Sequence, residues 1–366
     1  MHDLGGTIRA RTAEATLTMI EPYIKKAGIT RLANITGLDS IGLPVFTCIR
    51  PNARSLSTSQ GKGISDELAM CSAYMEAIEV YYAEALMPEY KAKLEQLKNQ
   101  NIIEPNTLSA GKFQLQNAQD HSWRWVTGTE IVSQQNYLIP YEAISLDLVE
   151  ESISHAIFEV STTGLAGGNT EDEAVLHALY EVIERNCSAQ FDLQTNKIDR
   201  LLDLSSIDYP HAQALLEKLR TCSVDVAVFD ITNEFGIASF HCIIADNNPF
   251  RKLGWFSGTG THHHRGVALC RAISEAVQSR LTHIAGSRDD MFPHHYQMTW
   301  QPLVLEGKRL YQQTPHQAFS DLKQQKQALI ETVCQQSCEK IIKYNYTNDN
   351  EPFSVVRILI PKLVTI

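Results

Sequence analysis

Apolar residues recur every three or four positions in several long segments, and this spacing predicts amphipathic helices. The predicted helices cover residues 7–28, 65–86, the later part of 161–192, 265–285 and 317–338. Ser65 is a suitable N-cap for the second of them. Gly286 follows the fourth at the position where a left-handed residue commonly ends a helix.

Shorter apolar runs bounded by turn residues predict strands. They cover residues 45–50, 123–128, 137–141, 223–230, 237–245, 340–344 and 354–360. The turn at 232–236 predicts a hairpin between the fourth and fifth, and residues 89–122 read as a lysine-rich helix followed by a loop. Strands mixed with long helices indicate an α+β (mixed α/β) class. No linker divides the chain, so a single domain of residues 1–366 is expected.

Three of the predicted helices repeat one pattern of acidic or amide side chains three residues apart. The pairs are Glu76 and Glu79, Glu181 and Glu184, and Glu275 and Gln278. Each helix follows a glycine-rich segment, at 61–63, 164–169 and 258–266, which is interpreted as a loop. A glycine loop that opens a helix can bind an anion, and carboxylates can bind a divalent metal. The pattern suggests a site for a metal-bound polyphosphate, whether it arose by duplication or by chance.

Composition narrows the classes of function. The chain has 366 residues and a formal net charge of −10, which disfavours broad binding to nucleic acid. No apolar run reaches the ~20 residues of a membrane helix, and the N-terminus lacks the order of a signal peptide. The eight cysteines form no C-x-x-C pair. Buried structural thiols and a reducing cytoplasm are therefore expected.

Each candidate side chain also has an ordinary structural interpretation. Glu76 and Glu79 share one helix face, as metal ligands or as a solvated acidic surface. Glu173 ends a capping-box sequence that begins at Thr170, so it is either a cap or a ligand. Arg185 either clamps a phosphate or neutralises the adjacent Glu184.

Other local signatures are incomplete. Lys62 is followed by Gly63 instead of Ser or Thr, so a P-loop is not indicated, although the lysine can still contact phosphate. The run His262, His263 and His264 allows zinc or, preferably, a contact with phosphate or substrate. No nucleophile elbow or dinucleotide fingerprint is present.

Three segments taken together resemble the three signatures of the YcaO family. They are residues 60–79, residues 161–185 and residues 271–280, with matching order, internal spacing and loop glycines. The resemblance covers roughly residues 30–300, with 301–366 as a C-terminal helix and strands. It implies a fold of the family's own that binds ATP with Mg2+ without a P-loop.

The resemblance also implies which residues form the site. The ATP-binding residues that it implies are Ser72, Glu76, Asn169, Arg185, Arg271 and Glu275, and Lys62 is added to them because it can contact phosphate from the glycine-rich segment. The expected metal ligands are Glu76, Glu79, Glu173, Glu181 and Glu184. Of these groups, Arg185 and Arg271 are the expected catalytic residues, because a cation can stabilise the transferring phosphoryl group.

The activity implied by the family is activation of a peptide backbone amide by O-phosphorylation. An external sulfur donor then gives a thioamide, and a neighbouring Cys, Ser or Thr gives an azoline. Residues 30–39, 50–54 and 286–290 look most like the subgroup that works beside a TfuA-type partner, which favours the thioamide. Val80 stands where many members have arginine, and residues 361–366 lack the proline-alternating tail of many azoline-forming members.

The expected partners are a peptide or protein substrate made ribosomally, a separate protein that presents it, and a second copy of the chain. No leader-binding module is recognised at the N-terminus. Two rivals stay open: a nucleotide-binding accessory protein without amide chemistry of its own, and a scaffold whose acidic helices are solvated surface.

Overall fold

The computed structural model divides the chain into two compact units, which are described separately. The first comprises Met1–Pro51, Leu56–Ala77 and Cys187–Asp321, and the second Asn52–Ser55, Ile78–Asn186 and Leu322–Ile366. The structure describes residues 1–108, 121–149, 158, 160–195, 197–248, 250, 253–297, 303, 306–337 and 339–363. The single-domain expectation stays a prediction.

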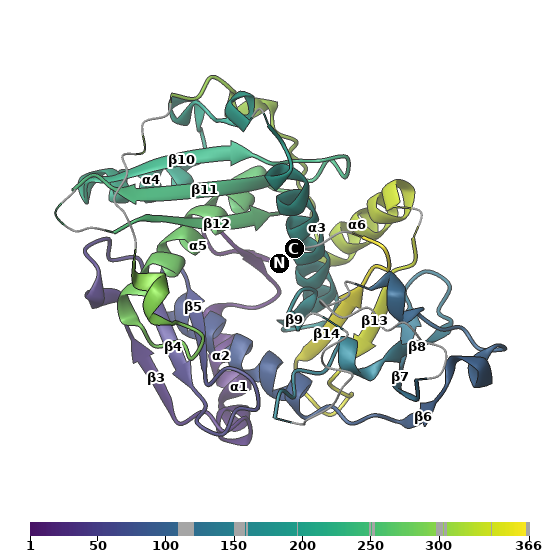
Figure 1. Ribbon diagram of the computed structural model, residues 1–366. Helices are drawn as coiled ribbons and strands as arrows, with labels where there is room; N and C mark the ends of the chain where they lie inside the picture. The colour runs from purple at the N-terminus through teal and green to yellow at the C-terminus, as the bar shows by residue number, and fades with distance from the viewer. Residues whose placement is uncertain are drawn as a thin grey trace. The chain divides into compact units, whose positions relative to one another are not determined.

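One part of the first unit is a three-stranded antiparallel sheet covered by helices (Figure 1). Its strands are β10 (Val224–Asp230), β11 (Ser239–Asp246) and β12 (Trp255–Thr261). Helix α5 (Arg265–Ala285) packs along β12, and α4 (Pro210–Thr221) contacts both α5 and β10. Phe240 and Ile273 lie in the buried core between these elements. The predicted hairpin is confirmed, with Asp230 paired to Phe240.

The same unit holds a second antiparallel sheet of β3 (Arg31–Asn34), β4 (Val45–Ile49) and β5 (Thr58–Lys62). Helix α1 (Ala13–Lys26) lies beside α2 (Asp66–Glu84), where the Cys71 thiol donates to the carbonyl of Ala13. Ser65 caps α2 by accepting from the amide of Leu68, as predicted. A short ribbon of β1 (His2–Asp3) and β2 (Ile8–Arg9) precedes α1.

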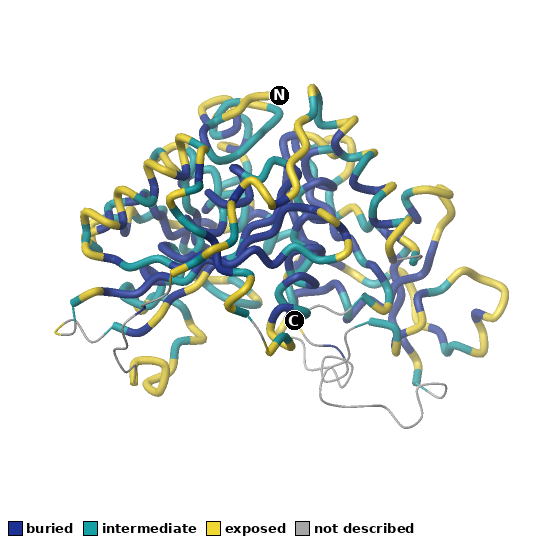
Figure 2. Tube along the Cα trace, turned by 90° about the horizontal axis from the view of Figure 1, so that it is seen from above, coloured by how far each residue is buried: buried dark blue, intermediate teal, exposed yellow. Residues whose placement is uncertain are grey.

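A six-stranded sheet, antiparallel in its ladders, forms the centre of the second unit. Its strands are β6 (Tyr90–Ala92), β7 (Trp123–Glu130), β8 (Asn136–Pro140), β9 (Leu165–Gly168), β13 (Ile342–Asn345) and β14 (Ser354–Leu359). Helices α3 (Glu171–Asp192) and α6 (Leu322–Ser337) meet where Gln325 donates to the Tyr180 hydroxyl. Trp123 and Trp125 are fully buried, while exposed positions lie on the connecting segments and along the helices (Figure 2).

The glycine-rich segments differ from the loops expected, because much of each one is a strand. These strands are β5, β9 and β12. A Cβ atom on Gly61 would lie 2.0 Å from the amide nitrogen of Ala73, and one on Gly258 would lie 2.3 Å from that of Ala276. The glycines therefore allow each strand to approach the backbone of the helix that follows it, which yields three similar strand–helix units.

The other differences are local. Within 89–108 the lysine-rich stretch forms β6 and a short 3-10 helix, Leu94–Leu97, so the predicted long helix is wrong there. Residues 109–120 lie outside the described part. Helix α4 was not predicted, although Pro210 in its first turn and the i, i+3, i+7 spacing of its buried apolar residues are typical of a helix. None of the described helices is long and apolar enough to cross a membrane.

Candidate functional site

In the first unit, charged groups from β5, α2 and α5 come together. Lys62 Nζ lies 3.4 Å from Glu275 Oε2. The carboxylate of Glu76 accepts from the backbone amide of Gln60 at 3.5 Å. The sequence separates Lys62 from Glu275 by more than 200 residues, so the fold creates this pair.

Burial raises the pKa of the Glu76 carboxyl from 4.5 to about 7. The charges of Lys62 and Arg288 partly offset this rise, whereas the like charge of Glu275 adds to it. A further cation beside Glu76 would stabilise its ionised form, because the cation's charge would offset both the cost of burying the carboxylate and its repulsion by Glu275.

Two more predicted residues lie one turn away from this pair. Ser72 precedes Glu76 on α2, and Arg271 precedes Glu275 on α5. The charge of Arg271, together with burial as the main cause, lowers the pKa of His262 well below its ordinary value. His262 is therefore neutral at physiological pH.

Two histidines of the run 262–264 form hydrogen bonds with backbone amides at the start of α5. His264 is the N-cap and accepts from the amide of Val267, while His262 Nδ1 accepts from the amide of His264. His263 is buried, and burial lowers its pKa to about 4. These contacts give two of the three histidines a structural role that was not predicted.

In the second unit, Glu181 on α3 is the centre of the site. Its Oε2 accepts from the amide of Gly164 at 3.1 Å, and its Oε1 lies 3.7 Å from Arg185. Burial raises the pKa of Glu181 to about 7; Arg185 lowers it in part, and Glu184 raises it further. Glu184 itself is 4% exposed.

The structure shows which side chains cap the start of α3. Thr170 Oγ1 accepts from the amide of Glu173 at 3.3 Å, as a cap would. The Glu173 carboxylate, however, accepts from the Asn169 side chain at 3.1 and 3.2 Å, and both residues are buried. On α2, Glu79 accepts from the amide of Gly167 at 2.5 Å.

The oxygen-rich donor set fits Mg2+. Mg2+ prefers hard oxygen ligands and is commonly held by one or two carboxylates with substrate phosphates supplying the rest. Among the described residues, no three Asp, Glu, His or Cys side chains are grouped so that they could hold a metal ion alone. A pair such as Glu181 and Glu184 supplies the one or two protein carboxylates that a nucleotide-bound Mg2+ requires.

Comparison with known proteins identifies the family. The family model described as "YcaO cyclodehydratase, ATP- and Mg2+-binding" matches residues 60–364. The chain belongs to the YcaO family.

The relatives of this YcaO protein agree with that assignment. A protein of Rhizobium leguminosarum bv. trifolii, named as an uncharacterized protein in the tfuA 3' region, is 30% identical over 372 residues, covering 97% of this chain and 88% of its own. The structure of YcaO from Methanopyrus kandleri bound with AMPPCP and Mg2+ has a TM-score of 0.75 at 18% identity, covering 98% of this chain and 92% of that one. A heterocyclase in complex with substrate and cofactor has a TM-score of 0.77 at 19% identity; the match covers 98% of this chain and 53% of the heterocyclase.

Residues outside the predicted ATP-binding and metal-binding sets also lie near the YcaO carboxylates. Gln278 Nε2 donates to the carbonyl of Gln60 at 3.3 Å, and Thr282 forms a hydrogen bond with the Gln60 side chain. Arg288 acts on the charge of Glu76. Gln60 and Gln278 fall inside the segments that resemble the family signatures, and Gln278 is already part of the repeated pattern. Arg288 falls inside a segment that resembles the TfuA-associated subgroup, but no role was predicted for it.

Proposed function

We propose that this YcaO protein uses ATP and Mg2+ to phosphorylate a peptide backbone amide, and that an external sulfur donor then gives a thioamide. The family description supports the use of ATP and Mg2+. The observation that carries the thioamide is the relative in a tfuA 3' region, which is similar over nearly the whole chain.

The carboxylates supply the negative groups that a metal-bound triphosphate requires. In this proposal more than one Mg2+ ion is held by Glu76, Glu79, Glu173, Glu181 and Glu184. The raised pKa values of Glu76 and Glu181 support it, because a bound cation relieves the burial and repulsion that raise them. Magnesium supplies neutralisation of the phosphate charge.

The remaining residues bind and orient the nucleotide. They are Lys62, Ser72, Asn169, Arg185, Arg271 and Glu275. The Arg185 guanidinium contacts Glu181 at 3.7 Å and is 39% exposed at its side chain, so it can reach a ligand while it stays beside the metal ligands. Lys62 is held by Glu275 in the same way. Positively charged groups so placed stabilise charge that develops on the transferring phosphoryl group.

The chemistry divides a difficult displacement into two easier ones. A sulfur nucleophile adds to the amide carbonyl, and the oxyanion that forms attacks the γ-phosphorus of ATP, releasing ADP. The C–O bond then breaks, inorganic phosphate leaves with the former amide oxygen, and loss of the sulfur proton gives the thioamide. Arg185 and Arg271 are proposed to stabilise the phosphoryl transfer, since both are cationic and oriented by helices.

A second product is consistent with the family description and with the heterocyclase among the similar structures. If a neighbouring Cys, Ser or Thr side chain adds to the same carbonyl, the product is an azoline and no sulfur donor is consumed. A TfuA-like partner and a homodimer are proposed on the family resemblance.

The test combines the purified chain, ATP, Mg2+, sulfide and a TfuA-like protein with a candidate precursor peptide encoded nearby. Mass spectrometry distinguishes the products, because a thioamide replaces oxygen by sulfur whereas an azoline loses one water. Amide oxygen labelled with a heavy isotope should appear in the released phosphate. Peptide-dependent ATP turnover without any change in peptide mass would contradict the proposal.

Two variants distinguish an enzyme from a non-catalytic scaffold and from a nucleotide-binding accessory protein. Glu184→Gln should weaken Mg-ATP binding at least about tenfold, because it removes a charge-assisted contact. Glu331→Gln, on the exposed face of α6, is the matched control and should bind normally. If Glu184→Gln binds Mg-ATP as tightly as the unaltered chain, the result favours a scaffold whose acidic helices are solvated surface. If the unaltered chain binds Mg-ATP but shows no peptide-dependent ATP turnover, the result favours an accessory protein.

A further inference from the structure

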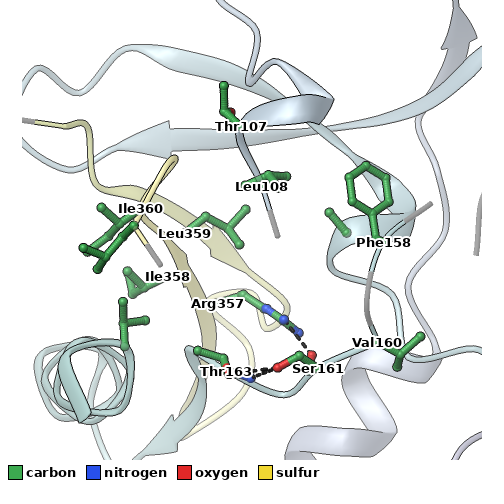
Figure 3. Close-up of a pocket in the computed structure, with 13 residues that line it drawn as sticks. Thr107, Leu108, Phe158, Val160, Ser161, Thr163, Arg357, Ile358, Leu359 and Ile360 are labelled. Carbon is green, nitrogen blue, oxygen red and sulfur yellow. Dashed lines mark hydrogen bonds between the residues drawn. The ribbon is translucent and has the colours of Figure 1, made fainter. Parts of the chain in front are cut away.

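A pocket in the second unit is lined by none of the residues proposed to bind ATP or Mg2+, although its lining residue Val182 follows Glu181 on α3. Its volume is about 160 Å3, and it is bordered by β14 and by the segment that leads into β9 (Figure 3). Nine of its thirteen lining residues are apolar, including Leu108, Phe158 and Ile358, and the other four are polar. A cavity of similar volume in another protein holds benzene, so this one has room for a ligand of about six to nine heavy atoms.

One charged side chain reaches this apolar pocket. Arg357 on β14 is 4% exposed and lines the pocket. Its Nη2 donates to the carbonyl of Ser161 at 2.6 Å. Its Nε and Nη1 are buried and have no hydrogen-bond partner among the described residues. A buried guanidinium with unused donors is costly unless an acceptor satisfies it.

Among the described residues, two neighbouring groups interact with Arg357, but neither gives Nε or Nη1 a hydrogen bond. The charge of Arg357 offsets part of the rise in the pKa of Glu181, whose oxygens contact Gly164 and Arg185. Burial raises the pKa of the Tyr346 hydroxyl, and the charge of Arg357 and a hydrogen bond from its side chain lower it in part. The same hydroxyl donates to the carbonyl of Ile144 at 2.6 Å, and Arg357 Nε and Nη1 still have no partner in the described part of the chain. The guanidinium therefore keeps its capacity for an additional anionic partner.

The polar end of the pocket also contains two hydroxyl groups. Ser161 Oγ donates to Thr163 Oγ1 at 2.8 Å and accepts from the Thr163 amide at 3.0 Å (Figure 3). This arrangement leaves the Thr163 hydroxyl proton for an acceptor in the pocket. A guanidinium fork beside a hydroxyl donor matches a carboxylate, and the apolar walls match a hydrocarbon group attached to it.

We propose that this pocket binds the carboxylate of a small apolar acid, with Arg357 as the anion-binding residue. The ligand is a monoanion that carries one ring or one short branched chain. Such a group is either a free carboxylic acid or the carboxyl terminus of a peptide that ends in an apolar residue. None of the residues proposed to bind the nucleotide lines this pocket, so the site extends the protein's binding capacity beyond the proposed reaction.

Titration calorimetry on the full chain, without nucleotide, tests this directly. Benzoate should bind at least about tenfold more tightly than benzamide, which has nearly the same shape but no charge. A short peptide ending in phenylalanine is compared with its C-terminal amide. Preference for the free-acid peptide over benzoate identifies a peptide terminus as the ligand, and the reverse identifies a free acid.

Variants locate the binding. Arg357→Gln should abolish the preference for benzoate over benzamide, and Leu108→Trp should fill the pocket and block both ligands without touching the guanidinium. Arg220→Gln, at a side chain that is 74% exposed, is the control for loss of one positive charge. Benzoate binding that is absent, or that survives in Leu108→Trp, would overturn the proposal. So would tighter binding of inorganic phosphate than of benzoate in the unaltered chain.

Discussion

At the scale of single residues, Glu181 shows how the fold changes the chemistry of one carboxyl group. In solution its pKa is 4.5, whereas burial on α3 raises it to about 7. The side chain is only 20% exposed, so water screens little of this effect. The folded state consequently holds a proton that the unfolded chain releases between these two pH values, and the stability that the proton provides is lost as pH rises through about 7.

Replacing Glu181 by an uncharged analogue should therefore stabilise the protein without nucleotide. Glu181→Gln is expected to gain on the order of 1–3 kcal/mol at about pH 8, and nothing at about pH 4.5, where the native side chain is also neutral. Thermal unfolding at both pH values measures the difference, with the exposed Glu331→Gln as a control. A gain that is the same at both pH values would show that Glu181 is not held above its ordinary pKa.

The same shift makes nucleotide binding depend on pH. Binding of a divalent cation requires the ionised carboxylate, so Mg-ATP affinity should rise with pH up to about 7 and then level off. The complex should release protons on formation, which calorimetry detects by comparing buffers of different ionisation enthalpy. In Glu76→Gln and Glu181→Gln the proton release should fall; an unchanged release in both would separate these residues from the metal.

At the scale of the elements, the start of α3 contains two functions that the sequence alone could not separate. Thr170 accepts from the amide of Glu173 and caps the helix, while the Glu173 carboxylate is held by Asn169. Thr170→Ala should thus cost about 1 kcal/mol of stability and leave Mg-ATP affinity unchanged. Glu173→Gln should instead lower the Mg-ATP affinity and leave the stability nearly unchanged. Thermal unfolding and calorimetry on both variants measure the separation, and equal losses of affinity would contradict it.

The glycines of strands β5, β9 and β12 allow each strand to lie close to the helix that follows it. Gly61→Ala and Gly258→Ala each place a Cβ within 2.3 Å of a helix backbone nitrogen, so each should destabilise the protein by more than about 3 kcal/mol or prevent folding. Gly37→Ala is the matched control, because a Cβ there meets nothing within 4 Å. Soluble yield and thermal unfolding measure the effect. Normal stability in Gly61→Ala would mean that the close strand–helix approach is not needed.

These strands also explain which elements could be predicted. Helices α2, α3 and α5 carry long apolar stripes, so periodicity located them to within a few residues. Strands β5, β9 and β12 are rich in glycine because a helix backbone presses on them, and that composition is typical of loops. The Lys62–Glu275 pair and the Arg357 pocket depend on long-range packing, which no local pattern encodes.

At the scale of the whole molecule, the cysteines bear on where sulfur comes from. The part of the chain that the structure describes contains no disulfide. Burial raises the pKa of Cys48, Cys71 and Cys270 to about 12 and raises that of Cys242 as well. At neutral pH roughly one such thiol in 100,000 is a thiolate, the form that attacks a sulfur donor. Burial therefore makes these four thiols poor carriers of sulfur.

Native alkylation tests this conclusion. At neutral pH, iodoacetamide should modify Cys48, Cys71, Cys242 and Cys270 at least about 100-fold more slowly in the folded protein than after unfolding, because both thiolate formation and access are suppressed. Mass spectrometry of the digested protein gives the rate at each site. The Cys71→Ala variant should retain thioamide formation with free sulfide. Rapid labelling of any of the four sites, with parallel loss of thioamide product, would instead indicate a cysteine of this chain that carries sulfur to the amide.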